Sequence, residues 1–209
     1  MKNDYTSIAE NYSEWAFNLK NNDIPESVQQ KLQIIVMDSL GLMASAKKEP
    51  YVVSLIDALK EIGDCVLIGH ENKTSPFNAS IINGTSVHGE DFDDTFEGTP
   101  VHVGAVMVPA MLSVAQTNNL SGQEFLGCRA IVSELVCRPA LLAPTAVHRQ
   151  GFHPTAIFGA FGSSIGISSV IGSDIKQMSS ALGIVGSMAS GIIEYLAEGT
   201  STKRLHPGW

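Results

Sequence analysis

The chain has 209 residues, of which 44% are apolar and 16% are charged, and its formal net charge is −8. This length allows one large domain or two small ones with a substantial core. The acidic balance and the lack of clustered Lys and Arg argue against a nucleic-acid partner. The charged fraction lies well below the roughly 25% of ordinary soluble domains, which indicates that a partner subunit or further chain covers part of the surface.

Apolar residues recur at helical spacing along most of the chain. Helix-start signals stand at Asp23-Ile-Pro-Glu26 and Ser75-Pro76, and Ser121-Gly-Gln-Glu124 is a capping box. Only Val66–Ile68 reads as a short edge strand, so we predict an all-α architecture without repeats or linkers. The predicted helices span 6–19, 26–46, 52–62, 76–88, 105–116 and 122–137, followed by two in the runs 154–173 and 181–191.

The run from Pro154 to Ser173 carries no charge and is rich in Gly, Ala and Ser, and a second run of small residues spans 181–191. Its length approaches the roughly 20 residues of a membrane-spanning helix, so a membrane hairpin is one interpretation. No basic flanks set a topology, however. A pair of buried helices packed closely through their small faces explains the same residues, and we expect no membrane partner.

The three cysteines, Cys65, Cys128 and Cys137, are odd in number and show no Cys-x-x-Cys spacing. Their simplest interpretation is buried free thiols in a reducing compartment. The first residues, Met-Lys-Asn-Asp-Tyr, lack the charged-then-apolar pattern of an export signal. We therefore expect a cytoplasmic protein.

The stretch His88–Gly104 is the most unusual of the chain, because five carboxylates fall within eight positions. A solvated acidic loop is the plain alternative to a site. Asp91-x-Asp93-x-Thr95 matches the nucleophile motif of haloacid-dehalogenase-like phosphatases, but the apolar strand that must precede that motif is missing; the stretch also partly matches the Asp-rich motifs of terpene cyclases. A divalent metal site is a further alternative, since carboxylates suit Mg²⁺. The carboxylates are Glu90, Asp91, Asp93, Asp94 and Glu97.

Two later stretches have features of an anion site. In Gly151-Phe-His-Pro-Thr155, His153 directly precedes a helix start, where the helix dipole favours anions and lowers the pKa of a nearby imidazole. A capping loop with an incidental histidine is the alternative. Lys203-Arg204 could supply positive charge to an anionic substrate, although such a pair is commonly a surface feature.

Taken together, Asn83–Thr95, His102, Gly151–Thr155 and Lys203–Trp209, in this order and at these separations, resemble the MmgE/PrpD family, and Asp38-Ser-Leu-Gly41 fits it too. The resemblance implies a multihelical all-α domain, a separate α+β lid that is missing from this chain, and a homodimer. It also implies chemistry without a metal or organic cofactor. Residues 1–209 would then be the N-terminal portion of one large, incomplete helical domain.

The same resemblance implies a lyase that removes or adds a proton next to a carboxylate of a small di- or tricarboxylate. We expect a hydro-lyase like 2-methylcitrate dehydratase, with decarboxylation or epimerisation as alternatives within the family. The family's site residues fall on Asp91, Thr95, His102, His153 and Lys203.

We assign acid–base roles to His102 and His153, an orienting or basic role to Asp91, and substrate binding to Thr95 and Lys203. Two departures from the family pattern stand out: Phe96-Glu97 replaces a second histidine, and the spacing to His102 is one residue longer than in some members. The other carboxylates have no expected role beyond local hydrogen bonding and capping.

The resemblance also implies that the chain ends about half way along the family's length. It would then be a fragment, a truncated gene product or one half of a split protein. A hypothesis from a different class follows, in which the chain is a catalytically inactive dimerisation or regulatory partner of a full-length paralogue.

Overall fold

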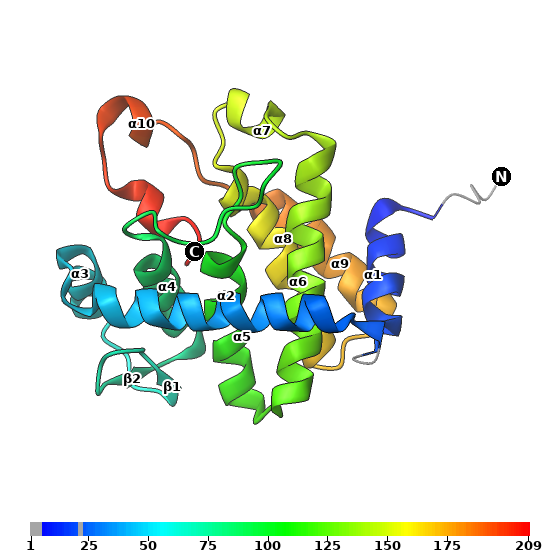
Figure 1. Cartoon of the computed structure of the whole chain (residues 1–209), viewed down its shortest axis with the longest axis horizontal. Helices are drawn as coiled ribbons and strands as arrows, with labels where there is room; N and C mark the ends of the chain where they lie inside the picture. Colours follow the sequence, from blue (N-terminus) through cyan, green and yellow to red (C-terminus); the bar gives the residue numbers. More distant parts are fainter. Residues whose placement is uncertain (1–5, 21–22) are drawn as a thin grey trace.

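The computed structural model describes residues 6–20 and 23–209, and this part of the chain is mostly helical (Figure 1). Two short strands, β1 (Cys65–Val66) and β2 (Lys73–Thr74), pair antiparallel. The helices are α1 (Ile8–Asn18), α2 (Glu26–Ser45), η2 (Ala46–Lys48), α3 (Pro50–Ala58), α4 (Pro76–His88), α5 (Val103–Asn118), α6 (Gly122–Leu142), α7 (Ala146–Arg149), α8 (Pro154–Val170), α9 (Ile175–Met188), α10 (Tyr195–Glu198) and η3 (Thr202–Leu205).

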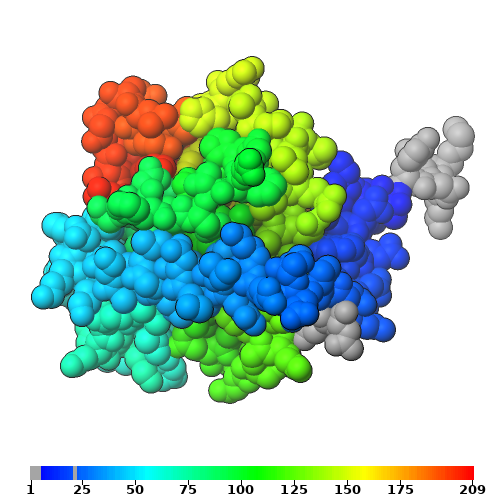
Figure 2. Space-filling model, viewed as in Figure 1, coloured from blue at the N-terminus to red at the C-terminus, as the bar shows by residue number. Residues whose placement is uncertain are grey.

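The core lies where α4, α5, α6 and α8 meet, and α2 runs across one face of these helices (Figure 1). In the space-filling view, the loop between α4 and α5 lies along the edge of α2, next to the C-terminal segment (Figure 2). A second apolar cluster joins α1 and α9 to α6 and α8. The central cluster buries residues from α2, α4, α5, α6 and α8, including Met43, Val87, Met107, Met111, Val132, Val136 and Phe158.

The predicted helix starts are confirmed at two positions. The Ser75 hydroxyl accepts the Asn78 N–H at the start of α4. At α6 the Ser121 hydroxyl accepts the Glu124 N–H, and the Glu124 carboxylate accepts the Ser121 N–H. Each such cap stabilises a helix by about 1 kcal/mol.

The prediction for the start of α2 was wrong in detail. Pro25 is the N-cap residue of this helix, and its side chain makes no capping hydrogen bond. The Asp23 carboxylate instead accepts the Lys20 N–H at 3.1 Å, outside the helix. A local turn therefore competes successfully for the acidic side chain.

Two predicted helix ends were also wrong. The third helix ends at Ala58 and not near Ile62, because the following segment turns so that Glu61 accepts hydrogen bonds from Ser75 and Asn78 at the start of α4. Helix α6 continues past Cys137 to Leu142 and contains Pro139. A proline near the end of a long helix removes one hydrogen bond, which packing against α5 and α8 offsets.

The short strand was predicted at 66–68 and lies at Cys65–Val66. Beyond Val66, the side chain of Asn83 on α4 takes the place of a strand partner. Its amide donates to the Val66 carbonyl at 3.0 Å and accepts the Ile68 N–H at 3.1 Å. A side-chain pairing of this kind leaves no periodic signal in the sequence.

The small residues of α8 mainly allow close contact with α5 and α6, and only partly with α9. A Cβ atom on Gly162 would lie 2.7 Å from Val136 Cγ2 and 2.9 Å from the Val132 carbonyl oxygen. By contrast, Gly183 on α9 has nothing within 4 Å of the corresponding position. In the described part of the chain, no helix combines the length and hydropathy needed to cross a bilayer.

This contrast predicts opposite effects of the same substitution. Gly162→Ala should destabilise the fold by about 1–3 kcal/mol, because Val136 and the α6 backbone must move. Gly183→Ala should stabilise it by about 0.5–1 kcal/mol through helix propensity alone. Urea unfolding followed by circular dichroism measures both, and equal effects of the two variants would contradict the packing described for α8.

All three cysteines are free, as predicted. Cys65 and Cys128 are buried, whereas Cys137 is only partly buried. Burial raises the pKa of the Cys128 thiol to about 11, so the thiol stays protonated and unreactive near neutral pH.

The C-terminal segment returns to α4 through a contact between two glycine backbones. A Cβ atom on Gly84 would lie 2.5 Å from the Gly208 Cα atom, so neither position has room for a side chain. The Trp209 ring packs edge-on against Phe77 at a centroid distance of 5.9 Å. This contact brings η3, with Lys203 and Arg204, next to the loop between α4 and α5.

Candidate functional site

The loop from Gly89 to His102 joins the end of α4 to the start of α5. Asp91 has a φ of +60°, a left-handed conformation that aspartate tolerates better than most residues and that is concentrated at functional sites. The Asp94 carboxylate accepts the Gly104 N–H at 2.8 Å at the start of α5. Burial raises the pKa of this carboxyl above its ordinary value. The Asp91 N–H donates to the His88 carbonyl at 3.2 Å at the end of α4, so the loop is fixed at both ends by the helices that it connects.

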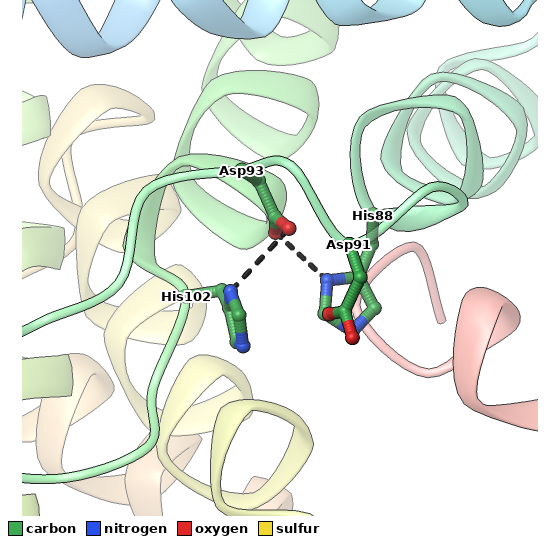
Figure 3. Close-up of side chains that lie close together, drawn as sticks. All are labelled: His88, Asp91, Asp93 and His102. Carbon is green, nitrogen blue, oxygen red and sulfur yellow. Dashed lines mark hydrogen bonds and ion pairs between the residues drawn. The ribbon is translucent and has the colours of Figure 1, made fainter.

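Asp93 is the centre of a buried group with two histidines (Figure 3). Its Oδ2 atom lies 2.7 Å from Nδ1 of His88, and its Oδ1 atom lies 3.3 Å from Nδ1 of His102. The side chains of Asp93 and His88 are fully buried, and that of His102 is 13% exposed. One carboxylate thus faces the Nδ1 atom of each of two imidazoles.

Burial and ion pairing compete in this group. Burial alone would raise the pKa of Asp93, but the interactions with His102 and His88 outweigh it and hold the pKa well below its usual range. Burial lowers the pKa of His88 in spite of Asp93. At His102 burial acts in the same direction, but the interaction with the Asp93 carboxylate prevails and raises the pKa.

His153 is the N-cap residue of α8 and is 3% exposed. Its ring stacks on that of His88 at a centroid distance of 5.4 Å, and its Nδ1 lies 3.3 Å from Nδ1 of His206. Burial, followed by the neighbouring His88 and His206, lowers the pKa of His153 strongly. This imidazole is consequently neutral at physiological pH.

Positive charge reaches the site from η3. The Lys203 ammonium pairs with the Asp91 carboxylate, whose side chain is 59% exposed. Arg204 lies 3.9 Å from a Glu90 oxygen and stacks over the Tyr51 ring at 4.4 Å. The Tyr51 hydroxyl donates to the same Glu90 oxygen at 2.9 Å. These contacts attach η3 to the loop and to α3.

The structure brings the five predicted site residues into one region. Asp91 and Lys203 are in direct contact, and the Thr95 hydroxyl lies 3.5 Å from His102 Nδ1. His102 and His153 are connected through the ring of His88, which contacts both. Their roles in catalysis and binding stay predictions.

Sequence reasoning missed four residues of this region, although three stood inside quoted motifs. Asp93 had no assigned role beyond local hydrogen bonding, yet it binds two imidazoles. His88 was noted only as the start of the acidic stretch. His206 and Tyr195 contact His153 and each other from the C-terminal segment. The one available signal was the i, i+2 spacing of Asp91 and Asp93, which cannot show which carboxylate turns inward.

The four residues His88, Asp91, Asp93 and His102 could offer ligands to a divalent metal, because one ligand atom from each lies within 4.8 Å of the others. The electrostatics favour a different use. Both Asp93 oxygens face imidazole nitrogens, and Asp91 already faces the Lys203 ammonium. A metal cation would have to displace or oppose these groups, whereas an anionic ligand could exchange with Asp91 at Lys203.

Comparison with known proteins agrees with the resemblance noted from the motifs. The MmgE/PrpD N-terminal domain matches residues 10–209. The chain is 26% identical over 204 residues to the cis-aconitate decarboxylase-like protein oryM of Aspergillus oryzae, covering 92% of this chain and 42% of that protein. It is 27% identical over 210 residues to the cis-aconitate decarboxylase of Mus musculus, covering 97% of this chain and 43% of that protein.

A third relative, the cis-aconitate decarboxylase of Aspergillus terreus, is 23% identical over 204 residues, covering 93% of this chain and 41% of that protein. The chain thus spans about two fifths of the length of these curated relatives. Because the family's N-terminal domain matches residues 10–209 of a mostly helical chain, the chain belongs to the MmgE/PrpD family.

Proposed function

We propose that the chain is the N-terminal, helical part of a lyase that transfers a proton next to a carboxylate of a small di- or tricarboxylate. The observation that carries the proposal is that the His88 ring contacts both His102 and His153, at centroid distances of 4.7 Å and 5.4 Å. The Asp93 carboxylate raises the pKa of His102, and burial lowers the pKa of His153. Two nearby titratable groups whose pKa values are moved apart are suited to act as acid and base.

The neutral His153 suits the base. A proton next to a carboxylate is weakly acidic, and its removal needs a positioned acceptor that is unprotonated at working pH. His102 suits the acid, because Asp93 raises its pKa and faces Nδ1, which leaves Nε2 for substrate. Such general acid–base catalysis contributes about 10²- to 10⁴-fold to the rate.

Lys203 suits the binding of a substrate carboxylate. Its present partner, Asp91, is more than half exposed, so an incoming carboxylate can take over the ammonium at little cost in desolvation. Charge-assisted hydrogen bonds from a lysine to a carboxylate are roughly twice as strong as neutral ones. The Thr95 hydroxyl, next to His102, would donate to the same substrate.

Dehydration of a 2-methylcitrate-like substrate is the reaction we expect from the motifs. In it, His153 takes the proton from carbon and His102 protonates the leaving hydroxyl. Decarboxylation is the second candidate, because three curated relatives are cis-aconitate decarboxylases or resemble them by name. In that reaction the substrate loses CO₂, and His102 delivers a proton to the carbon that carried the lost carboxylate.

The remaining expectations concern the whole protein. We propose that residues 1–209 are the N-terminal portion of one large helical domain, that a lid segment completes the site, and that the assembled enzyme is a homodimer. An inactive partner of a full-length paralogue is the competing hypothesis.

The test is an assay of the full-length gene product with 2-methylcitrate and with cis-aconitate, with products identified by NMR. We expect turnover of one of them and no loss of activity after treatment with EDTA. Turnover of neither substrate or of any related polycarboxylate would refute the lyase assignment. Loss of activity with EDTA and recovery with Mg²⁺ would assign the four-residue cluster to a metal.

A further inference from the structure

His206 faces the proposed base directly and has no role in the mechanism described so far. It lies at the end of η3, and its Nδ1 is 3.3 Å from Nδ1 of His153. The two rings meet at a centroid distance of 5.4 Å with an angle of 47° between their planes. The Tyr195 ring contacts both, at centroid distances of 5.9 Å and 5.8 Å.

The backbone around Gly191 is shaped for this contact. The Gly191 carbonyl accepts the His153 N–H at 2.8 Å. Its φ of +118° favours glycine, and a Cβ atom there would lie 3.2 Å from His206 Nδ1 and 2.9 Å from the Ala156 Cβ atom. One residue therefore holds the backbone of His153 and leaves room for the ring of His206.

Two neutral imidazoles that share a hydrogen bond between their Nδ1 atoms have only two arrangements, because one nitrogen must carry the hydrogen and the other must accept it. If His206 donates, His153 carries its hydrogen on Nε2 and cannot take a proton there. If His206 accepts, His153 carries its hydrogen on Nδ1 and presents a lone pair at Nε2. Only the second arrangement makes His153 a base toward substrate.

We propose that His206 is a positioning residue that accepts a hydrogen bond from Nδ1–H of His153 and thereby fixes the tautomer in which Nε2 is the base. This inference rests on the proposed function, since it assigns a partner to the base of that reaction. When Nε2 takes the substrate proton, the Nδ1–H···Nδ1 hydrogen bond persists and stabilises the imidazolium formed. The arrangement is the counterpart of the Asp93 contact at His102.

The test compares His206→Asn with His206→Leu in the full-length protein. The asparagine side-chain oxygen can occupy the place of Nδ1 and accept the same hydrogen bond, whereas leucine is similar in size and accepts none. We expect His206→Leu to lower kcat by about 10²- to 10⁴-fold with little change in KM, as for loss of the correct tautomer elsewhere. His206→Asn should recover most of this loss, and His70→Leu, a histidine outside the site, should leave kcat unchanged.

A second readout does not depend on activity. In protein labelled with the heavy nitrogen isotope at histidine, heteronuclear NMR shows which ring nitrogen of His153 carries hydrogen. We expect Nδ1–H in the parent and in His206→Asn, and a shift toward Nε2–H in His206→Leu. An Nε2–H tautomer in the parent, or full kcat in His206→Leu, would overturn the proposal. An inactive parent with the expected tautomers would instead refute the lyase assignment alone.

Discussion

Replacing His153 with asparagine should lower kcat by about 10²- to 10⁴-fold, the usual contribution of a general base. The residue is 3% exposed, and burial lowers its pKa so that it is neutral when substrate arrives. Asparagine is a favoured N-cap residue and keeps the backbone N–H that Gly191 accepts, so α8 should begin as before. The loss should therefore come from the missing imidazole and not from a change of fold.

Steady-state kinetics of the full-length protein measures the effect, and circular dichroism with thermal unfolding checks the fold. The matched control is His70→Asn, which removes a histidine from the loop between β1 and β2. A kcat for His153→Asn within about threefold of the parent, with the control equally active, would show that His153 is not the base.

Asp93→Asn should change the pH dependence of the enzyme as well as its rate. Asp93 raises the pKa of His102, which in turn must be protonated to act as the acid. Without the carboxylate charge, burial would dominate and the pKa of His102 would fall. The basic limb of the kcat/KM profile should therefore move to lower pH.

The same variant should lose about 1.5–3 kcal/mol of stability at neutral pH, as for a buried hydrogen bond to a charged group. Because folding lowers the pKa of Asp93, the ionised carboxylate stabilises the folded protein above the unfolded pKa of this group. This stabilisation is lost as pH falls through the folded pKa. The control is Glu97→Gln, an exposed carboxylate of the same loop. An unchanged basic limb in Asp93→Asn would show that Asp93 does not set the pKa of the catalytic acid.

The helices could be read from the sequence because their apolar periodicity and caps act locally. Ser75 and Ser121 mark their helices as predicted. The errors arose where a distant residue decided the outcome. Glu61 leaves the third helix to reach Ser75, and Asn83 replaces a strand partner for Val66. The residues next to Glu61 and Asn83 in the sequence therefore give no signal of these contacts.

The candidate site likewise has a part that the sequence predicts and a part that it does not. Residue types and order indicated Asp91, His102, His153 and Lys203, and the fold brings them together. The sequence could not indicate which aspartate turns inward, because Asp91 and Asp93 differ by two positions in an irregular loop and not in a strand or helix. The backbone at Asp91 is left-handed, a conformation that the residue types of the loop do not specify.

The contact between Gly84 and Gly208 has a consequence for the order in which the molecule is assembled. Asp91 and Lys203 are separated by 112 positions, so closing this contact costs chain entropy that the local helices do not. The helical core can form first, and the charged edge of the site then forms last, when the two glycine backbones meet. Variants with a side chain at either glycine should accordingly keep a folded core while Lys203 and His206 fail to reach their partners, a defect that unfolding measurements would miss and substrate binding would detect.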